Sequence, residues 1–211
     1  MLGRRRSHRQ VPRTKDDRLH AKRQQQILEA AKHCFIQEGF HRTSMRQIFQ
    51  EAGISAGGAY NYFSSKDDII KALVQEESAD IEQLIARAHK CKSPLEGIAK
   101  LISDIISYTS HDDAVLAIVV YAEACRNADI KALEQENAEQ LSDFFKTKIA
   151  EGITQELIIQ QYPVADCVEF FMALLEGYIG RLASNEKLSS KKSARLAKIA
   201  VLQFLENSEL G

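Results

Sequence analysis

The sequence contains no tryptophan, and only three prolines and ten glycines occur among its 211 residues. Few residues therefore interrupt helices, and long runs of Ala, Leu, Ile, Glu, Lys and Gln favour an all-α fold. Hydrophobic residues make up 45% of the chain, which is enough to bury a sizeable core in one or two domains.

Long apolar runs are also missing. No run approaches the roughly 18 residues that a membrane span needs, and the opening residues, MLGRRRSHRQ, lack the apolar segment of a signal peptide. We therefore expect a cytoplasmic protein without a membrane partner. The cysteines are Cys34, Cys91, Cys125 and Cys167, and their wide scatter predicts free thiols in a reducing compartment.

No spacing typical of catalysis or metal binding stands out. Neither of the two neighbouring His/Cys pairs has the paired spacing of a zinc site. The glycine pair Gly57-Gly58 is not followed by the Lys-Ser ending of a phosphate-binding loop. We therefore expect no enzyme, no metal and no cofactor. A redox-sensitive thiol at Cys91 or Cys125 stays open as an alternative.

The small net charge of −1 hides a strong asymmetry. Residues 1–23 hold nine Lys and Arg against two Asp, a net charge of +7 that leaves −8 for the other 188 residues. A basic arm on an acidic body predicts contact with a polyanion, although a solvated tail would carry the same charges. We expect residues 1–21 to be a disordered arm.

The first third of the chain has the pattern of three short helices. An apolar stripe from Ile27 to Phe35 predicts a helix over residues 22–38, which Gly39 would end. Thr43 is expected to cap a second helix over 44–52, and Ser55 a third over 55–62, with a glycine turn between them. This arrangement predicts a helix-turn-helix in a domain of residues 22–68.

Two adjacent glycines inside the third helix need an explanation. Each costs about 1 kcal/mol relative to alanine in a helix interior. Gly57 and Gly58 remove side chains where a helix backbone would lie against phosphates and base edges, in a groove roughly 12 Å wide. A loose helix or a plain glycine turn is the alternative reading.

Residues 27–70 resemble the DNA-binding domain of the TetR family of transcriptional regulators. The matching elements, in chain order, are the two alanines before Lys32, then Phe35, Gly39-Phe40, TSM, Ile48, AGIS, Gly57, Tyr60, Phe63 and Ser65-Lys66. Two positions depart from the family pattern. Phe49 stands where alanine is usual, and Ala56 where a lysine or arginine is common.

The resemblance implies a homodimer whose N-terminal domains bind a double-stranded DNA operator. It also implies that a small hydrophobic or amphipathic effector, bound in the C-terminal domain of residues 69–211, releases the DNA. We therefore predict a transcriptional repressor. A ligand-binding helical dimer that has lost DNA binding is the alternative, because the third helix carries no Lys or Arg.

The predicted DNA contacts follow from chemistry and from the resemblance. Helix starts and Lys66 suit phosphate oxygens, whereas Asn61 can pair with adenine and Arg46 with guanine or a phosphate. The two tyrosines are assigned by resemblance. The full set is Thr43, Ser44, Arg46, Ser55, Gly57, Gly58, Tyr60, Asn61, Tyr62 and Lys66.

The rest of the chain predicts six further helices, over 66–90, 93–108, 111–126, 130–150 with a break at Gly152, 163–184 and 189–206. Candidate effector contacts are Tyr108, Tyr121, Phe145, Phe171 and Tyr178, although aromatic residues at helical spacing are more often plain core. Glu123 interrupts an apolar run, so it could meet a cationic ligand or pair with an arginine.

The last two helices are apolar around much of their circumference. The resemblance implies that they pair with their copies in a four-helix dimer interface, whereas a monomeric core would give the same pattern. The predicted interface residues are Phe170, Leu174, Leu175, Ile199, Leu202 and Leu205.

Overall fold

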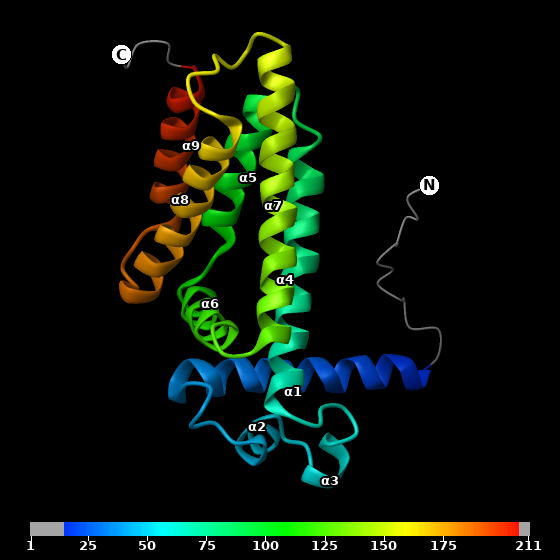
Figure 1. Ribbon diagram of the computed structural model, residues 1–211. Helices are drawn as coiled ribbons and strands as arrows, with labels where there is room; N and C mark the ends of the chain where they lie inside the picture. The colour runs from blue at the N-terminus through cyan, green and yellow to red at the C-terminus, as the bar shows by residue number, and fades with distance from the viewer. Residues whose placement is uncertain (1–14, 207–211) are drawn as a thin grey trace. The chain divides into compact units, whose positions relative to one another are not determined.

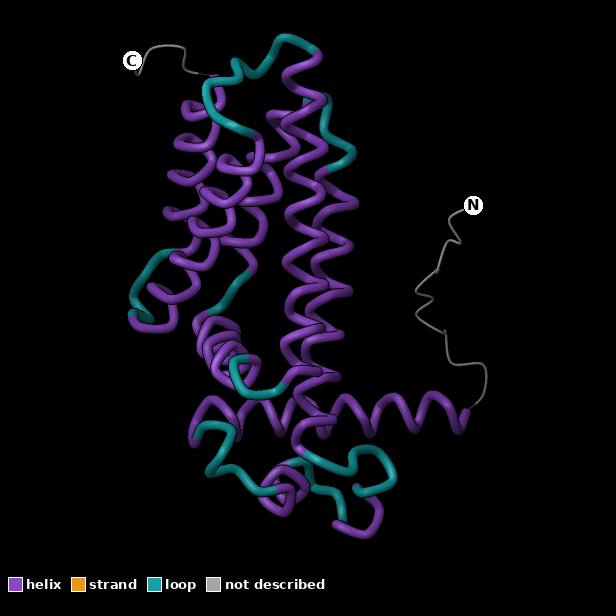
Figure 2. Tube along the Cα trace, viewed as in Figure 1, coloured by secondary structure: helices purple, strands orange, loops and turns teal. Residues whose placement is uncertain are grey.

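The computed structural model describes residues 15–206, and every regular element in that part is an α-helix (Figures 1 and 2). The chain divides into two compact units, Met1–Ile69 and Ile70–Gly211. The helices are α1 (Lys15–Glu38), α2 (Met45–Glu51), α3 (Ala56–Ala59), α4 (Lys66–Ala88), α5 (Pro94–Tyr108), α6 (His111–Ala124), α7 (Ala128–Thr154), α8 (Val164–Ser184) and α9 (Ser190–Glu206). The all-α prediction is confirmed. None of the described helices is both long and apolar enough to cross a bilayer.

Helix α1 begins at Lys15 rather than near residue 22. Its apolar stripe is as predicted, since Ile27 and Phe35 are fully buried. The preceding turns have no such stripe, but they consist mainly of good helix formers. Residues 15–21 are therefore helical and not part of a disordered arm; residues 1–14 lie outside the described part. Gly39, at φ +79°, ends the helix as predicted.

Ser44, and not Thr43, caps α2. The Ser44 hydroxyl accepts the Gln47 backbone N–H at 3.3 Å, and the Gln47 side chain accepts the Ser44 N–H at 2.8 Å. Thr43 is buried, and its hydroxyl donates to the Gly39 carbonyl at 2.9 Å and the Cys34 carbonyl at 3.2 Å. The predicted cap at Thr43 is wrong because this side chain closes the connection between α1 and α2.

Helix α3 is much shorter than the helix predicted over residues 55–62. It consists of one turn, Ala56–Ala59, and a hydrogen-bonded turn follows it. The Gly58 N–H donates to the Ser55 carbonyl at 3.0 Å, and the Tyr62 N–H to the Ala59 carbonyl at 2.9 Å. These are bonds between residues three apart, which tighten short helical segments. Two glycines in so short a stretch weaken any longer helix.

Side-chain caps start α5, α6 and α7 in the C-terminal unit. Ser93 accepts the Glu96 N–H at 3.2 Å before α5, and Ser110 and Asp113 form a capping box at the start of α6. Asn127 caps α7, which begins slightly earlier than predicted. The predicted starts of α5 and α6 are confirmed.

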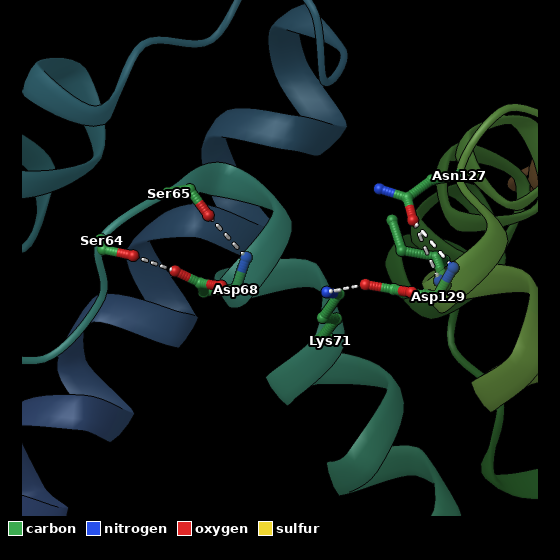
Figure 3. Close-up of polar contacts among 7 residues, drawn as sticks. Ser64, Ser65, Asp68, Lys71, Asn127 and Asp129 are labelled. Atoms are coloured by element: carbon green, nitrogen blue, oxygen red, sulfur yellow. Dashed lines mark hydrogen bonds and ion pairs between the residues drawn. The ribbon is translucent and has the colours of Figure 1, made fainter.

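Two polar contacts connect α4 with α7, which run side by side (Figure 1). The Lys71 ammonium lies 2.6 Å from Asp129, beside the Asn127 cap (Figure 3). Farther along the two helices, the Gln140 amide donates to the Ser78 hydroxyl at 3.1 Å. Because Asp129 is largely exposed, its ion pair adds little stability; together the two contacts fix which turns of the helices face each other.

The core of the C-terminal unit combines aliphatic side chains with a run of aromatic rings. Phe145 lies between Phe144 and Phe171, with ring centroids 5.8 Å and 5.4 Å away. Both Phe145 and Phe171 are fully buried. The four cysteines of the described part are free, and burial raises the pKa of the Cys34 and Cys167 thiols.

Gly152 does not break α7, contrary to the sequence prediction. The helix continues to Thr154, and the Gly152 carbonyl then accepts the N–H groups of Leu157 and Ile158 at 2.9 Å and 3.1 Å. A Cβ atom at Gly152 would lie 2.5 Å from Ile158 Cδ1. The glycine is therefore required so that the buried Ile158 can pack against the helix backbone.

Replacing Gly152 by alanine is expected to destabilise the protein by about 1–2 kcal/mol, because the added methyl group displaces a buried side chain. Urea unfolding followed by circular dichroism measures this loss. Gly180→Ala is the matched control, since a Cβ atom there meets nothing within 4 Å. Equal or higher stability of Gly152→Ala would contradict the packing account.

Candidate nucleic-acid interface

The α2–turn–α3 segment carries an exposed polar and aromatic surface. Gly53, at φ +65°, makes the tight turn between the two helices. Arg46 and Asn61 are exposed, and Tyr60 keeps 53% of its surface accessible. Arg46 makes no hydrogen bond or ion pair with any other residue in the described range. These side chains are available for contact with a partner.

Phe49 supports this surface from within. It is 1% exposed, and its ring meets that of Tyr60 edge to face with centroids 5.1 Å apart. The small core of the N-terminal unit thus accommodates the phenylalanine that departs from the family pattern. Its packing orients the Tyr60 ring while leaving the opposite side of that ring open.

The glycine pair is not required by the protein's own packing. Neither glycine has a positive φ, a Cβ atom at Gly57 would meet nothing within 4 Å, and one at Gly58 would make only an ordinary contact with Ser55 at 3.4 Å. Alanine would therefore fit at both positions and favour the helix. The free protein thus offers no steric reason for glycine at these two positions.

The first half of α1 adds a basic surface, and the sequence analysis had assigned its residues up to 21 to an unstructured arm. The His20 ring lies 4.6 Å from the ring of Tyr62, which ties α1 to the turn after α3. Arg18 and Lys22, on the same helix, are exposed. The sequence signal was the charge pattern, but only a helix begun at Lys15 places His20 against Tyr62.

Lys66 has partners inside the N-terminal unit. Its ammonium donates to the carbonyl of Phe40 at 2.5 Å and lies 4.4 Å from the centre of the Phe40 ring. A second carbonyl, of His41, lies 3.4 Å away. Lys66 therefore holds the start of α4 against the loop that follows α1, and a phosphate contact at this residue stays a prediction.

The start of α4 is rich in polar contacts of its own. The Ser65 hydroxyl accepts the Asp68 N–H at 3.1 Å, and the Ser64 hydroxyl donates to the Asp68 carboxylate (Figure 3). Hydrogen bonds from Ser64 and Ser65 lower the pKa of Asp68. Asp67 and Asp68 already complement the helix dipole, so this helix start suits a phosphate less well than the sequence suggested.

The ten predicted DNA contacts thus divide into three groups. Ser44, Arg46, Ser55, Gly57, Tyr60 and Asn61 are exposed, and Gly58 and Tyr62 are partly accessible. Lys66 is partly accessible but bound internally. The side chain of Thr43 is 2% exposed, which leaves its hydroxyl no surface for DNA.

Comparison with known proteins bears directly on this segment. The sequence model described as "Bacterial regulatory proteins, tetR family" matches residues 27–73. The HTH-type transcriptional repressor Rv1474c of Mycobacterium tuberculosis is 28% identical over 200 residues, which cover 94% of this chain and 98% of the repressor. The chain thus carries a TetR-family DNA-binding domain at residues 27–73.

Solved structures of TetR-family and other regulators share the fold over nearly the whole chain. A putative transcriptional regulator from Saccharomonospora viridis, in complex with choline, has a TM-score of 0.76 at 18% identity, covering 89% of this chain and 99% of that one. The regulator FadR of Bacillus subtilis, in complex with stearoyl-CoA, has a TM-score of 0.72 at 22% identity, covering 84% and 97%. The matched domain and the curated relatives, rather than these structures, show that the chain is a DNA-binding transcriptional regulator.

The aromatic residues predicted as effector contacts occupy different environments in this protein. Phe145 and Phe171 are fully buried and pack against each other, as core residues do. Tyr108 is 63% exposed and lies beside Arg87. Only Tyr121 and Tyr178 combine burial with a polar group inside the C-terminal unit, so the structure does not gather the five predicted residues around one space.

The residues predicted for the dimer interface also separate. Phe170 and Ile199 are 46% and 45% exposed, and Leu174 and Leu202 are partly buried. Leu175 and Leu205 are at most 3% exposed and belong to the unit's own core. We therefore name as the outer face the exposed side of α8 and α9, made by Phe170, Ala173, Gly177, Leu196, Ile199 and Ala200.

Acidic side chains that sequence analysis missed approach one another within the C-terminal unit. Burial, and next the charge of Glu77, raise the pKa of Glu134 to about 7. Glu77 is exposed as a residue, but desolvation of its carboxyl group by surrounding protein atoms raises its pKa, with the charges of Asp113 and Asp80 as further causes. The sequence signal was the position of Glu134 in the apolar stripe of α7. It was missed because α7 carries many other charged residues.

The native protein is expected to become less stable as pH rises, because Glu134 must then ionise in the folded state. The Glu134→Gln variant should not show this decrease. The folded protein keeps the Glu134 proton up to about pH 7, whereas the unfolded chain releases it near the ordinary pKa of 4.5. Stability therefore falls as pH rises through this window, by about 1 kcal/mol after allowance for solvent screening. Urea unfolding measured at several pH values should show that the stability of the variant increases relative to that of the native protein as pH rises.

Glu136→Gln, at an exposed position on the same helix, serves as the control and should follow the native protein at every pH. Parallel stability curves for Glu134→Gln and the native protein would contradict the perturbed carboxyl.

Proposed function

We propose that the protein binds an operator as a homodimer through the surface of α2, α3 and the first half of α1, and that a small-molecule effector in the C-terminal unit releases it. The glycine pair carries this proposal. Gly57 and Gly58 lower helix stability without any packing need of their own, and they lie between exposed Arg46 and exposed Tyr60 and Asn61. Close approach of a DNA backbone explains all of these features together.

Charge supports the same reading. The third helix lacks basic residues, but Arg46 on α2 and Arg18 and Lys22 on α1 are exposed. Contacts from such side chains to phosphates supply affinity that falls as salt rises. Base discrimination then rests on Arg46, Asn61, the tyrosines and the shape of the DNA. Any contribution of residues 1–14 concerns a segment outside the described part.

The outer face supports the homodimer. The two helices meet at one end of this face, where the ring of Phe170 on α8 stacks on that of the partly buried Phe204 on α9 with centroids 4.8 Å apart. Small residues Ala173 and Gly177 follow Phe170 on α8 and would allow a second helix to approach closely. A two-fold pair of such faces would present two DNA-binding domains to two half-sites.

Helix α4 supports control by an effector. It starts in the N-terminal unit and continues into the C-terminal unit, so a ligand that shifts α4 changes the element that carries the DNA-binding domain. Effector release also fits relatives of the fold that are solved with choline or stearoyl-CoA.

Tyr60→Phe tests the DNA surface. The variant keeps the ring that packs against Phe49 but removes the hydroxyl, so we expect unchanged stability and a DNA affinity about tenfold lower. Tyr162→Phe is the control, because Tyr162 is 48% exposed and lies in the C-terminal unit. Anisotropy titrations on one operator duplex measure both variants; equal affinities would refute the assignment of Tyr60.

A further inference from the structure

The inward-facing stripe of α7 is interrupted by two polar residues. Ile130, Leu141 and Phe145 are buried at helical spacing along this stripe. Glu134 and Asn137 fall between them, four and seven residues after Ile130, where the same spacing calls for apolar side chains. Both polar side chains are therefore directed into the helical bundle of the C-terminal unit.

Each of these two side chains has one buried polar atom without a hydrogen-bond partner in the described range. Glu134 Oε1 and Asn137 Nδ2 are buried atoms without a hydrogen bond to any residue in the described range, and Asn137 as a whole is only 5% exposed. The hydroxyl of buried Tyr178, on the inward side of α8, also lacks a hydrogen bond to any residue in the described range. Buried polar groups are almost always paired. An unpaired acceptor and an unpaired donor one helical turn apart thus point to a missing ligand.

The surroundings of Glu134 are negative. The negative charge of Glu77 on α4 raises the pKa of Glu134. Burial is the largest cause of the raised pKa of the Tyr121 phenol in α6, and the charges of Glu77, Glu134 and Glu176 raise it further. No lysine or arginine in residues 15–206 offsets the raised pKa values of Glu77 and Glu134. Glu77 is exposed as a whole residue, so it lies on the solvent side of this acidic group.

We propose that the effector is an organic ammonium cation, held by Glu134 with Glu77 and Asn137 between α4, α6 and α7. This proposal rests on the proposed effector-controlled function and specifies its ligand. An ammonium N–H would donate to Glu134 Oε1, and the Asn137 amide would donate to an oxygen of the ligand. The two residues lie about 4.5 Å apart along the helix axis, so the ligand carries nitrogen and oxygen at a similar separation.

The chemistry favours an amine over other ligands. An anion would face three carboxylates and would leave Glu134 Oε1 without a donor. A quaternary ammonium group has no N–H to give, and residues 15–206 contain no group of three or more His, Cys, Asp or Glu arranged to hold a metal ion. The Tyr121 ring adds an aromatic face of the kind that attracts cations.

The test uses the full-length protein and a panel of apolar amines bearing hydroxyl or carbonyl groups. Each amine is paired with the alcohol and the carboxylic acid of the same carbon skeleton. Binding is measured by calorimetry, and release of an operator duplex is measured in parallel by anisotropy. We expect binding only among the amines, with affinity at least tenfold lower in Glu134→Gln and in Glu77→Gln and unchanged in Glu136→Gln.

A pH series gives a readout that loss of folding cannot imitate. Glu134 ionises near pH 7 while an alkyl amine stays charged, so amine affinity should rise about tenfold between pH 6 and pH 8 in the native protein. The groups that share this site are Glu77 and, beyond it, Asp80, Asp113, Tyr121 and Glu176. In Glu134→Gln the rise should be absent.

The outcomes separate this inference from the proposed function. Operator release by neutral or anionic compounds, unaffected by Glu134→Gln, would overturn the ammonium site and leave effector control standing. Absence of binding by every amine in the panel would also overturn the site. Amines that bind in a Glu134-dependent way without releasing the operator would establish the site and contradict effector-controlled release.

Discussion

Replacing Gly57 by alanine is expected to lower operator affinity at least tenfold while leaving the free protein equally or more stable. The methyl group meets no protein atom, so the short helix gains up to about 1 kcal/mol. Against DNA, the same group separates the backbone from the phosphates it would touch. Gly57→Leu should extend the loss to about a hundredfold, since each tenfold step is about 1.4 kcal/mol.

The Gly57 variants are expected to lose DNA affinity while they keep or gain stability, and this combination makes the test decisive. A variant that binds DNA poorly because it has unfolded would lose thermal stability and affinity together, whereas we expect stability to be kept. The melting temperature and the anisotropy titration are therefore measured on the same preparations. Full operator affinity in Gly57→Leu would show that this glycine does not face DNA.

Ile199→Asp is expected to convert the protein to a monomer and to reduce operator affinity by at least about a hundredfold, because a monomer engages one half-site instead of two. Ile199 is 45% exposed and lies on the outer face, so the substitution leaves the internal core of the unit intact. Sedimentation velocity measures the oligomeric state, and anisotropy measures the affinity.

Leu157→Asp is the matched control. Leu157 is 44% exposed and lies in the turn between α7 and α8, outside the residues that define the outer face. It should remain dimeric and bind normally. A dimeric Ile199→Asp protein with native affinity would show that the outer face is not the dimer interface.

Local chemistry made much of the fold predictable. Ser93 with Pro94, the Ser110 box and Gly39 mark helix ends through hydrogen bonds within a few residues. Predictions failed where a contact with a residue farther away in the chain determines the role of a side chain or the end of a helix. Thr43 looks like a cap but bonds back to α1, and Gly152 looks like a break but accommodates Ile158.

The candidate sites were predictable to different degrees. The residues predicted for the α2–α3 surface form a contiguous stretch, so the sequence pattern could group them, and their contact with DNA stays a prediction. For Leu175 and Leu205, periodicity shows that a helix is apolar but not which of its sides faces its own core. The Glu134 site was missed because Glu77 and Glu134 come from different helices, and only the fold brings their charges together.

The most direct test of the central claim is anisotropy of the purified protein with a duplex from upstream of its own gene, against a scrambled duplex, across a salt series. We predict affinity for the upstream duplex of about 10⁻⁸ M or tighter, far weaker binding to the scrambled one, and a steep loss of affinity with salt. Equal, weak binding to both duplexes, repeated with sequences selected from a random library, would contradict a DNA-binding surface on α2 and α3.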